Sequence, residues 1–217
     1  MQRLTLPLAM AIVALGAGCS SLDRSRNLAN LDVSGRTLAQ QVCSNCHGVD
    51  GNSVSPNFPN LAAQPKDYLI AELDEFRKHT RVDPAGFEYM WGLSHNLTDK
   101  QISELADYFA AQKAVSPGAG NPLQAARGQK IFEEGITAQT TPPCKACHGE
   151  SGAGDGIFPR IAYQHADYIV KQLSVFKRTE QRPDAALMKV VAHTLTKEDM
   201  GDVAQYLQGM TASGSAR

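Results

Sequence analysis

The sequence has no excess of charge of one sign, because 21 Lys and Arg residues are balanced by 22 Asp and Glu residues over 217 positions. Proteins that bind nucleic acids normally carry a clear basic excess, so we expect no nucleic-acid partner. Aromatic residues are also scarce, at 6% with a single Trp. Two domains cut from this chain would each be small, near the size at which a side-chain core alone gives marginal stability. A large buried cofactor would compensate for that shortage.

Long apolar runs are absent except at the N-terminus. Residues 4–18 are uncharged and mostly apolar, and Arg3 precedes them. This pattern is typical of a secretory signal, and the run is too short for a membrane-spanning helix. We therefore predict a signal peptide over residues 1–19 and an exported, periplasmic protein. The alternative is a buried helix, but the run shows no amphipathic period.

Cysteine is limited to five residues, and one of them, Cys19, stands apart in the stretch LGAGCSS. This stretch resembles a bacterial lipoprotein cleavage box, in which the Cys becomes the lipidated first residue. It departs from that pattern because Gly16 stands where Leu or Val is preferred. A lipid on Cys19 would give the protein contact with a membrane, whereas ordinary cleavage nearby would discard this Cys or leave it free.

The other four cysteines form two Cys-x-x-Cys-His motifs, one with Cys43 and Cys46 and one with Cys144 and Cys147. Zinc, thiol–disulfide exchange and covalent haem all use paired cysteines. A four-cysteine zinc site would need its pairs within a compact knuckle, and these pairs are a whole domain apart. A thioredoxin-like pair would lie beside a βαβ unit, and no convincing alternating strand is present.

Covalent haem fits the motifs best, because a His follows each second cysteine directly. The cysteines would form thioether bonds to the porphyrin, and His47 and His148 would ligate the iron. Export agrees with this interpretation, since c-type haem is attached outside the cytoplasm. The sequence therefore predicts two covalently bound haem c groups.

The chain is an internal repeat. FPNLAAQPKDYLIAELDEFRK begins at Phe58 and FPRIAYQHADYIVKQLSVFKR at Phe158, an offset of 100. HNLTDKQISELADYFA begins at His95 and HTLTKEDMGDVAQYLQ at His193, an offset of 98. The second copy also has an insertion around EEGITAQTTPP. Such self-similarity predicts tandem domains.

A stretch rich in Pro and Gly, AVSPGAGNP, marks a linker between the copies. We expect a flexible segment at 20–32, a first domain at 33–113, the linker at 114–122, a second domain at 123–210 and a tail at 211–217. The apolar stripe Leu69, Leu73 and Phe76 recurs at helical spacing, which predicts an all-α fold. Capping pairs open the last helix of each copy, at Thr98 with Gln101 and at Thr196 with Asp199.

A second axial ligand for each iron would come from Met or His. Met90 and Met188 correspond in the repeat, since each lies seven residues before the aligned Leu of its copy. His95 and His193 are also aligned, five residues after each Met. We prefer the Met pair as ligands, and we expect the two His to cap a helix or to lie on the surface.

A Pro follows each motif at a similar interval, Pro59 after His47 and Pro159 after His148. A ligating His usually donates its other ring N–H to an acceptor that fixes the orientation of the ring. Each Pro carbonyl is a candidate acceptor. The alternative is a Pro that only makes the loop rigid.

Taken together, the two CxxCH motifs, the FPNLAAQ and FPRIAYQ blocks, and a Met followed by LT and a terminal helix resemble the di-haem cytochrome c4 family. The resemblance covers residues 33–210. It implies two class I cytochrome c domains around a pseudo-twofold axis, with the haems close to the domain interface and His/Met ligation. It also implies a periplasmic role in respiratory electron transfer.

Family members commonly carry electrons from a quinol-oxidising complex to a terminal haem–copper oxidase, so the resemblance implies an electron carrier rather than an enzyme. One alternative is an electron-transfer subunit of a dehydrogenase or flavocytochrome complex, in which only the partner differs. A di-haem peroxidase is a further alternative. It would need an exchangeable distal site on one haem with acid–base residues beside it.

Overall fold

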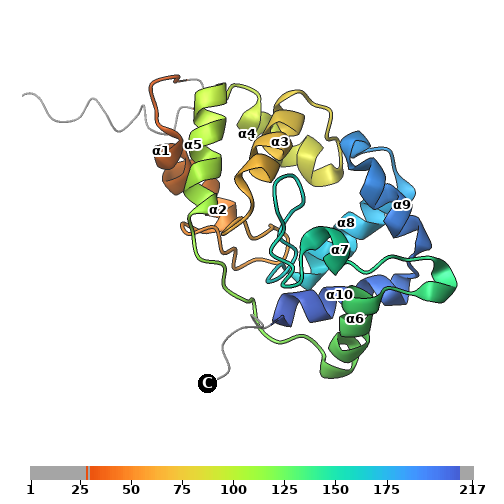
Figure 1. Cartoon of the computed structure of the whole chain (residues 1–217). Helices are drawn as coiled ribbons and strands as arrows, with labels where there is room; N and C mark the ends of the chain where they lie inside the picture. Colours follow the sequence, from red (N-terminus) through yellow and green to blue (C-terminus); the bar gives the residue numbers. More distant parts are fainter. Residues whose placement is uncertain (1–27, 29, 211–217) are drawn as a thin grey trace, which may run out of the picture.

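The chain forms two helical units in succession, coloured orange to yellow-green and green to blue in Figure 1. The computed structural model describes Leu28 and residues 30–210. The expected signal peptide, Cys19 and the expected tail at 211–217 lie outside the described residues. The described part contains isolated β-bridges but no β-strand, so the expected all-α fold is confirmed.

The first unit begins with one continuous helical stretch and ends with a longer helix. The stretch consists of α1 (Gly35–Leu38), the π-helical η2 (Ala39–Cys43) and α2 (Ser44–His47). The remaining elements are α3 (Lys66–Arg77), the π-helical η3 (Gly86–Met90), α4 (Trp91–Ser94) and α5 (Asp99–Ala110).

The second unit repeats this order with a longer opening. It begins with α6 (Pro122–Glu134), the 3-10 helix η4 (Thr137–Gln139) and α7 (Lys145–His148). The remaining elements are α8 (Ala166–Arg178), the 3-10 helix η5 (Pro183–Ala185), α9 (Ala186–Thr194) and α10 (Lys197–Gly209). The loop with η4 separates α6 from α7, and it contains the insertion that the repeat indicated.

The terminal helices begin with the capping pairs that the sequence predicts. In α5, the Thr98 hydroxyl accepts from the backbone N–H of Gln101, whose side chain accepts from the backbone N–H of Thr98. Thr196 and Asp199 form the same reciprocal pair in α10. Each box satisfies two backbone donors that the first turn of a helix otherwise leaves without a partner.

The first and last helices of each unit cross at a glycine. At Gly35 in α1, a Cβ atom would lie 2.5 Å from the Glu104 Cβ atom of α5. At Gly128 in α6, a Cβ atom would lie 2.0 Å from the carbonyl oxygen of Asp202 in α10. Any larger residue would therefore push the two helices apart, so the crossing requires glycine at both positions.

Gly128→Ala is expected to lower the free energy of unfolding by about 1–3 kcal/mol, the usual cost of overpacking a tight contact. Gly201→Ala, on α10 of the same crossing pair, is the matched control, because the nearest atom to its new Cβ is the Gln124 Nε2 at 3.7 Å. Replacing this helical glycine should be neutral or stabilise by about 0.5–1 kcal/mol. Denaturant unfolding followed by circular dichroism measures both, and equal stability of the two variants would contradict the argument.

Each unit has its own hydrophobic core. The first core is built around Leu38, Ile102 and Phe109, which are at most 3% exposed. The second is built around Phe132 and includes Met200, which is 2% exposed. Met200 is thus a core residue of the terminal helix α10.

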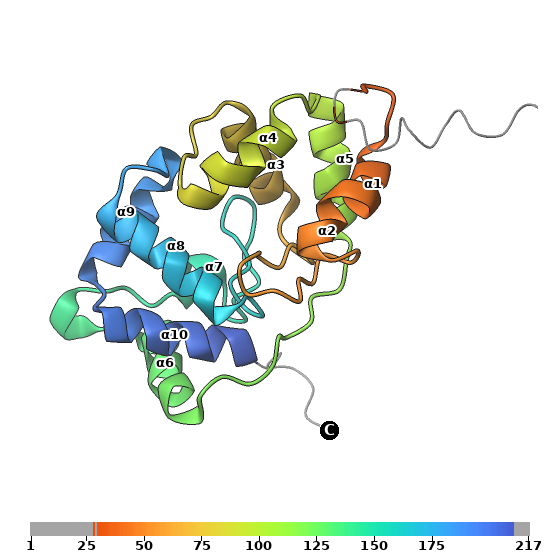
Figure 2. The ribbon, with the colours of Figure 1, turned by 180° about the vertical axis from the view of Figure 1, so that it is seen from behind.

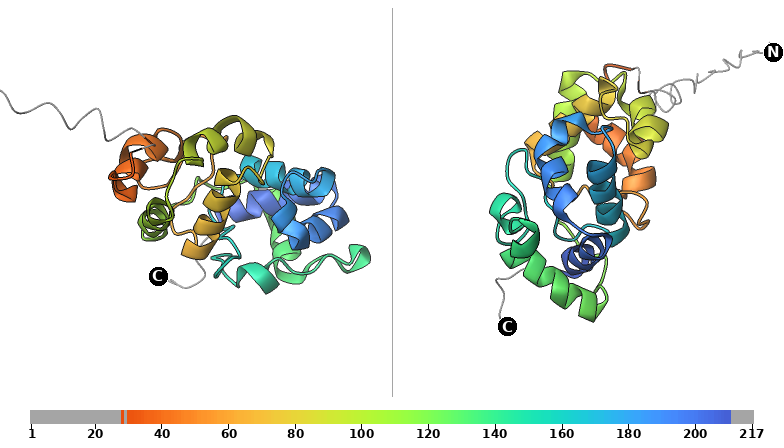
Figure 3. Two further views of the ribbon diagram at one scale, coloured as in Figure 1. Left: turned by 90° about the horizontal axis from the view of Figure 1, so that it is seen from above. Right: turned by 90° about the vertical axis from the view of Figure 1, so that its right-hand side faces the viewer.

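The two units lie side by side, and Figures 2 and 3 show the first unit against the second from several directions. The connecting segment packs on α10, because the Ser116 hydroxyl donates to the Gln208 carbonyl and the backbone N–H of Asn121 donates to the Gln205 side chain. Across residues 28 and 30–210, every helix is too short or too polar to span a bilayer.

Candidate functional site

Each Cys-x-x-Cys-His motif occupies one helical turn that ends at a glycine. In the first unit, Cys43 ends η2 while Cys46 and His47 belong to α2, so the three side chains lie at i, i+3 and i+4. Gly48 ends the turn with a φ of 77°, a left-handed conformation that glycine adopts without strain. Residues 144–149 repeat this geometry around α7, with Gly149 at a φ of 80°.

The histidines of the two motifs are buried and oriented by proline carbonyls. His47 and His148 are 7% and 6% exposed. The Nδ1 atom of His47 lies 2.9 Å from the Pro59 oxygen, and that of His148 lies 2.8 Å from the Pro159 oxygen. As carbonyls only accept, Nδ1 carries the proton in both rings, and each Nε2 is left with a lone pair for a metal.

Burial lowers the pKa of both histidines, although the hydrogen bond to the Pro carbonyl acts in the opposite direction. A lowered pKa favours the neutral imidazole, which is the form that binds a metal. The geometry and the protonation state of His47 and His148 therefore both suit ligation of an iron.

The four thiols are free, with no disulfide in either pair. Burial raises the pKa of Cys43 to about 12 and that of Cys144 to about 11. A raised pKa disfavours the thiolate, which is the attacking form in thiol–disulfide exchange. Within the described ranges, no cluster of three or more His, Cys, Asp or Glu side chains could hold a metal ion. This donor set fits thioether attachment of a porphyrin better than a thiolate site.

Met90 and Met188 lie half-buried at equivalent places in the two units. Met90 is the last residue of η3, and Met188 lies in the first turn of α9. Met188 packs against the same hydrophobic core as Cys144, so the second motif and its aligned Met share one core.

His95 and His193, the rival ligands, lie on the surface. The His95 Nδ1 atom is 3.1 Å from the Gly92 oxygen, and its ring packs on Trp91 at a centroid distance of 5.2 Å. The His193 Nδ1 atom is 2.8 Å from the Lys189 oxygen of its own helix. Both rings are engaged with their local helix, as the surface interpretation predicts.

Large apolar side chains flank the motifs and the methionines on exposed positions. Val54 is 99% exposed after the first motif, and Ile157 is 68% exposed after the second. Leu187 and Val190, on either side of Met188, are 56% and 67% exposed. A large flat apolar group such as a porphyrin would remove such surface from water if it lay against it.

A reciprocal pair of glutamines joins the units directly beside the two prolines. The Gln164 side chain accepts from the Asn60 N–H at 2.8 Å and donates to the Asn60 carbonyl at 3.1 Å. The Gln64 side chain does the same to Arg160, at 2.9 Å and 2.8 Å. Asn60 and Arg160 follow the two prolines, so each unit holds the segment that orients the histidine of the other.

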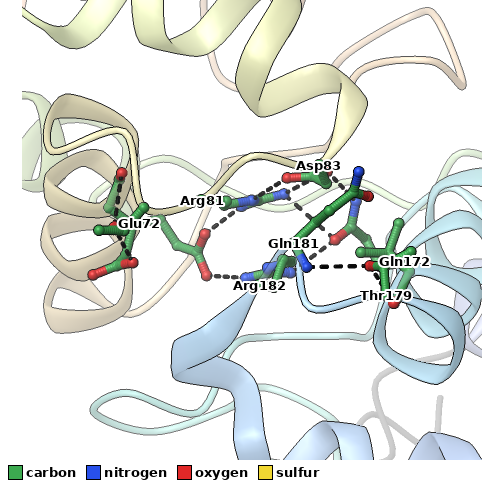
Figure 4. Close-up of polar contacts among 10 residues, drawn as sticks. Glu72, Arg81, Asp83, Gln172, Thr179, Gln181 and Arg182 are labelled. Atoms are coloured by element: carbon green, nitrogen blue, oxygen red, sulfur yellow. Dashed lines mark hydrogen bonds and ion pairs between the residues drawn. The ribbon is translucent and has the colours of Figure 1, made fainter.

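A second contact between the units is a buried crossing of two arginines, shown in Figure 4. Arg81 donates to Glu72 of its own unit and to Gln172 of the other. Arg182 donates to Gln172 of its own unit, at 2.8 Å, and to Glu72 of the other. Asp83 completes the group by accepting from Arg81 at 2.8 Å.

This arginine crossing holds the chain segments that lead to the two methionines. Residues 81–83 precede η3, and Arg182 precedes η5, while the Val82 N–H donates to the Gln181 carbonyl at 2.9 Å. The Arg81 guanidinium lies 4.5 Å from the Phe76 ring centre, and that of Arg182 lies 4.8 Å from the Phe176 ring centre. Each arginine therefore packs on the equivalent Phe of its own unit.

Sequence reasoning missed both contacts between the units. The repeat already paired Gln64 with Gln164, and the same offset pairs Glu72 with Gln172. Polar residues kept at equivalent positions of the two copies were the available signal. An alignment of the two copies shows which residues correspond but not which of them meet across an interface.

Comparison with known proteins gives consistent matches. The family model described as Cytochrome c matches residues 33–113 and 125–211. A cytochrome c4 of Pseudomonas aeruginosa is 37% identical over 175 residues, which is 78% of this chain and 84% of that protein. A thiosulfate dehydrogenase electron acceptor of Thiomonas intermedia is 31% identical over 81% of this chain and 83% of its own length. The solved cytochrome c4 of Acidithiobacillus ferrooxidans is 40% identical, with a TM-score of 0.72 over 76% of this chain and 96% of that chain.

Proposed function

The chain belongs to the di-haem cytochrome c4 family of the cytochromes c, and on that premise we propose that it carries single electrons from a quinol-oxidising complex toward a terminal oxidase in the periplasm. Its two cytochrome c domains bind two covalent haem c groups, whose irons each accept and release one electron. The protein is thus an electron-carrier cytochrome, and the route and compartment are the proposal.

The observation that carries the proposal is the duplicated His–Pro hydrogen bond, which supports two equivalent proximal sites in one molecule. We assign residues 33–113 and 123–210 as the two carrier domains, joined by the linker 114–122. One haem is held by Cys43 and Cys46 with His47 and Met90 as axial ligands. The other is held by Cys144 and Cys147 with His148 and Met188.

The choice of Met over His on the distal side is supported by the position of the side chains. Met90 and Met188 are half-buried, whereas His95 and His193 are exposed and hydrogen-bonded within their own helices. Soluble electron carriers use Met to raise the reduction potential. His/Met ligation therefore suits a carrier that delivers electrons to an oxidase.

Because both haem sites are in one chain, an electron can pass between them without a diffusional encounter of two proteins. The glutamine pair, Gln64 and Gln164, bonds the backbone beside one proximal carbonyl to a side chain of the other domain. This rigid arrangement supports transfer between the two haems, with a different partner at each domain.

A dehydrogenase is the second candidate donor. It is favoured by the similarity to a thiosulfate dehydrogenase electron acceptor. In that case the haem sites would be the same, and only the partner would differ. A peroxidase would need an exchangeable distal position, and both copies instead offer an aligned Met.

A lipid on Cys19, which lies outside the described residues, would place the carrier at a membrane surface. Mass spectrometry of the mature N-terminus detects such a lipid.

Stopped-flow spectroscopy tests the route with the complete mature protein. We expect the oxidised carrier to be reduced by a purified quinol-oxidising complex with quinol, and the reduced carrier to be reoxidised by a terminal oxidase. Co-purification of the carrier with one of these complexes from membranes would agree. Rapid reduction by a dehydrogenase and its substrate, with none by the quinol-oxidising complex, would replace the proposal with the second candidate. Rapid oxidation of the reduced haems by peroxide would indicate a di-haem peroxidase instead.

A further inference from the structure

Arg160 crosses from the second domain into the first between the two proximal segments. Its side chain is buried, with the residue 4% exposed. The Nε atom donates to the Ala62 carbonyl at 2.9 Å, and a terminal nitrogen donates to the Asn60 carbonyl at 3.2 Å. The other terminal nitrogen donates to the Ala162 carbonyl. The guanidinium therefore lies between the domains and bonds the backbone of both.

The hydrogen-bond partners of this guanidinium are all neutral. Among the described residues, no Asp or Glu forms an ion pair with Arg160, whereas the arginine crossing contains Glu72 and Asp83. Three backbone carbonyls supply the hydrogen bonds that a buried cation requires. Burial lowers the pKa of Arg160 to about 10, so the side chain still carries its charge at neutral pH.

The Arg160 guanidinium lies beside the backbone segments that hydrogen-bond both proximal histidines. Arg160 follows Pro159, whose carbonyl accepts from His148. The Asn60 carbonyl that it binds follows Pro59, whose carbonyl accepts from His47. One cation thus lies next to both segments that orient the histidines.

The equivalent position of the first domain carries no charge. The residue equivalent to Arg160 in the first domain is Asn60, which is neutral and 2% exposed. Its side chain accepts a hydrogen bond from the Ser53 N–H at 2.7 Å and donates one to the Tyr163 carbonyl at 2.7 Å. A neutral side chain therefore satisfies the hydrogen bonds of the interface at that position.

We propose that Arg160 is a fixed buried charge that raises the reduction potential of both haems. The inference relies on the axial histidines assigned under the proposed function. Reduction of a ferric haem removes one positive charge, so a nearby cation favours the reduced form. The net charge around a redox centre is a recognised determinant of its potential. Salt screens a buried charge much less than a surface charge, so the effect persists at physiological ionic strength.

The test compares Arg160→Gln, which removes the charge, with Arg160→Lys, which keeps it, in the complete protein with both haems. Arg178→Gln is the matched control, since it removes a positive charge from an exposed position of the same domain. Spectroelectrochemical titration should show both potentials lowered in Arg160→Gln. The expected shift is about tenfold in the equilibrium between ferric and ferrous haem, or about 59 mV for one electron. Arg160→Lys and Arg178→Gln should keep both potentials close to those of the unmodified protein.

Unchanged potentials in a folded Arg160→Gln variant would overturn the proposal. Equal falls in Arg160→Gln and Arg160→Lys would also overturn it, because the effect would then come from geometry rather than charge. If Arg160→Gln does not fold, the Arg160→Lys titration decides alone, and a lowered potential there counts against the proposal. The near-infrared band, recorded on the same samples, reports the Met ligands separately, so an error in the axial assignment is seen independently.

Discussion

Met188→Ala is expected to remove about half of the near-infrared absorption band of the oxidised protein, and Met90→Ala the other half. This band arises from charge transfer between a methionine sulfur and ferric iron, and each domain should contribute one such bond. The potential of the altered haem should fall as well, because the Met ligand raises it. Absorption spectra and redox titrations of the two single variants measure both effects.

Met200→Leu is the matched control for these substitutions, since Met200 is a core residue of α10 at 2% exposure. A swap of similar volume should cost less than about 1.5 kcal/mol and leave the near-infrared band intact. His95→Gln and His193→Gln should also leave the band unchanged. Loss of the band in a His variant, with no change in the Met variants, would reverse the ligand assignment.

The sequence predicted the parts of the sites that depend on short segments. Cys43, Cys46 and His47 are within five positions of one another, and one helical turn brings them together whatever the rest of the fold does. The capping boxes at Thr98 and Thr196 are equally local, and both are present. Local hydrogen bonding determines such features, so residue types at fixed spacing are sufficient to find them.

The domain interface could not be predicted in the same way. Glu72 and Arg182 are far apart in the chain, and their contact depends on how two folded units pack. The loops around them differ in length between the copies, and Asp83 joins the crossing from only one copy. Neither hydrophobic period nor motif spacing contains this information.

Two π-helical turns were also not predicted. The sequence predicted an all-α fold without distinguishing kinds of helix, but η2 (Ala39–Cys43) and η3 (Gly86–Met90) are wider than an α-helix. Each ends at a residue assigned to the haem site, Cys43 or Met90. Such turns are frequent at functional sites. Amphipathic spacing does not distinguish them from α-helix over so few residues.

Glu72→Gln is expected to lower the free energy of unfolding by about 3–5 kcal/mol, the usual cost of breaking a buried ion pair by removing one partner. Glu72 accepts from both Arg81 and Arg182, and the three side chains are 15%, 6% and 9% exposed. The substitution is nearly isosteric and copies Gln172, the equivalent residue of the other domain. It leaves two buried guanidinium groups with Asp83 as their one carboxylate in the crossing.

The matched control is Glu198→Gln, because the Glu198 carboxylate is 79% exposed and 3.9 Å from Arg127. Removing an exposed ion pair should change stability by about 0–1 kcal/mol. Denaturant unfolding of the haem-loaded proteins measures both variants. Stability of Glu72→Gln equal to that of the control would show that Glu72 does not compensate the buried charges of the crossing.

The loss of unfolding free energy in Glu72→Gln should become smaller as the pH falls. Burial alone would raise the pKa of Glu72, but Arg81 and Arg182 more than offset it and hold the pKa below its usual value of 4.5. A carboxyl whose pKa is lowered by folding stabilises the protein above its unfolded-state pKa, and this contribution is lost as the pH falls through the folded-state pKa. The difference in stability between the unmodified protein and Glu72→Gln should therefore be full near pH 7 and shrink as the pH falls below about 4.5. A difference that stays constant down to about pH 3 would mean that Glu72 acts through packing and not through its charge.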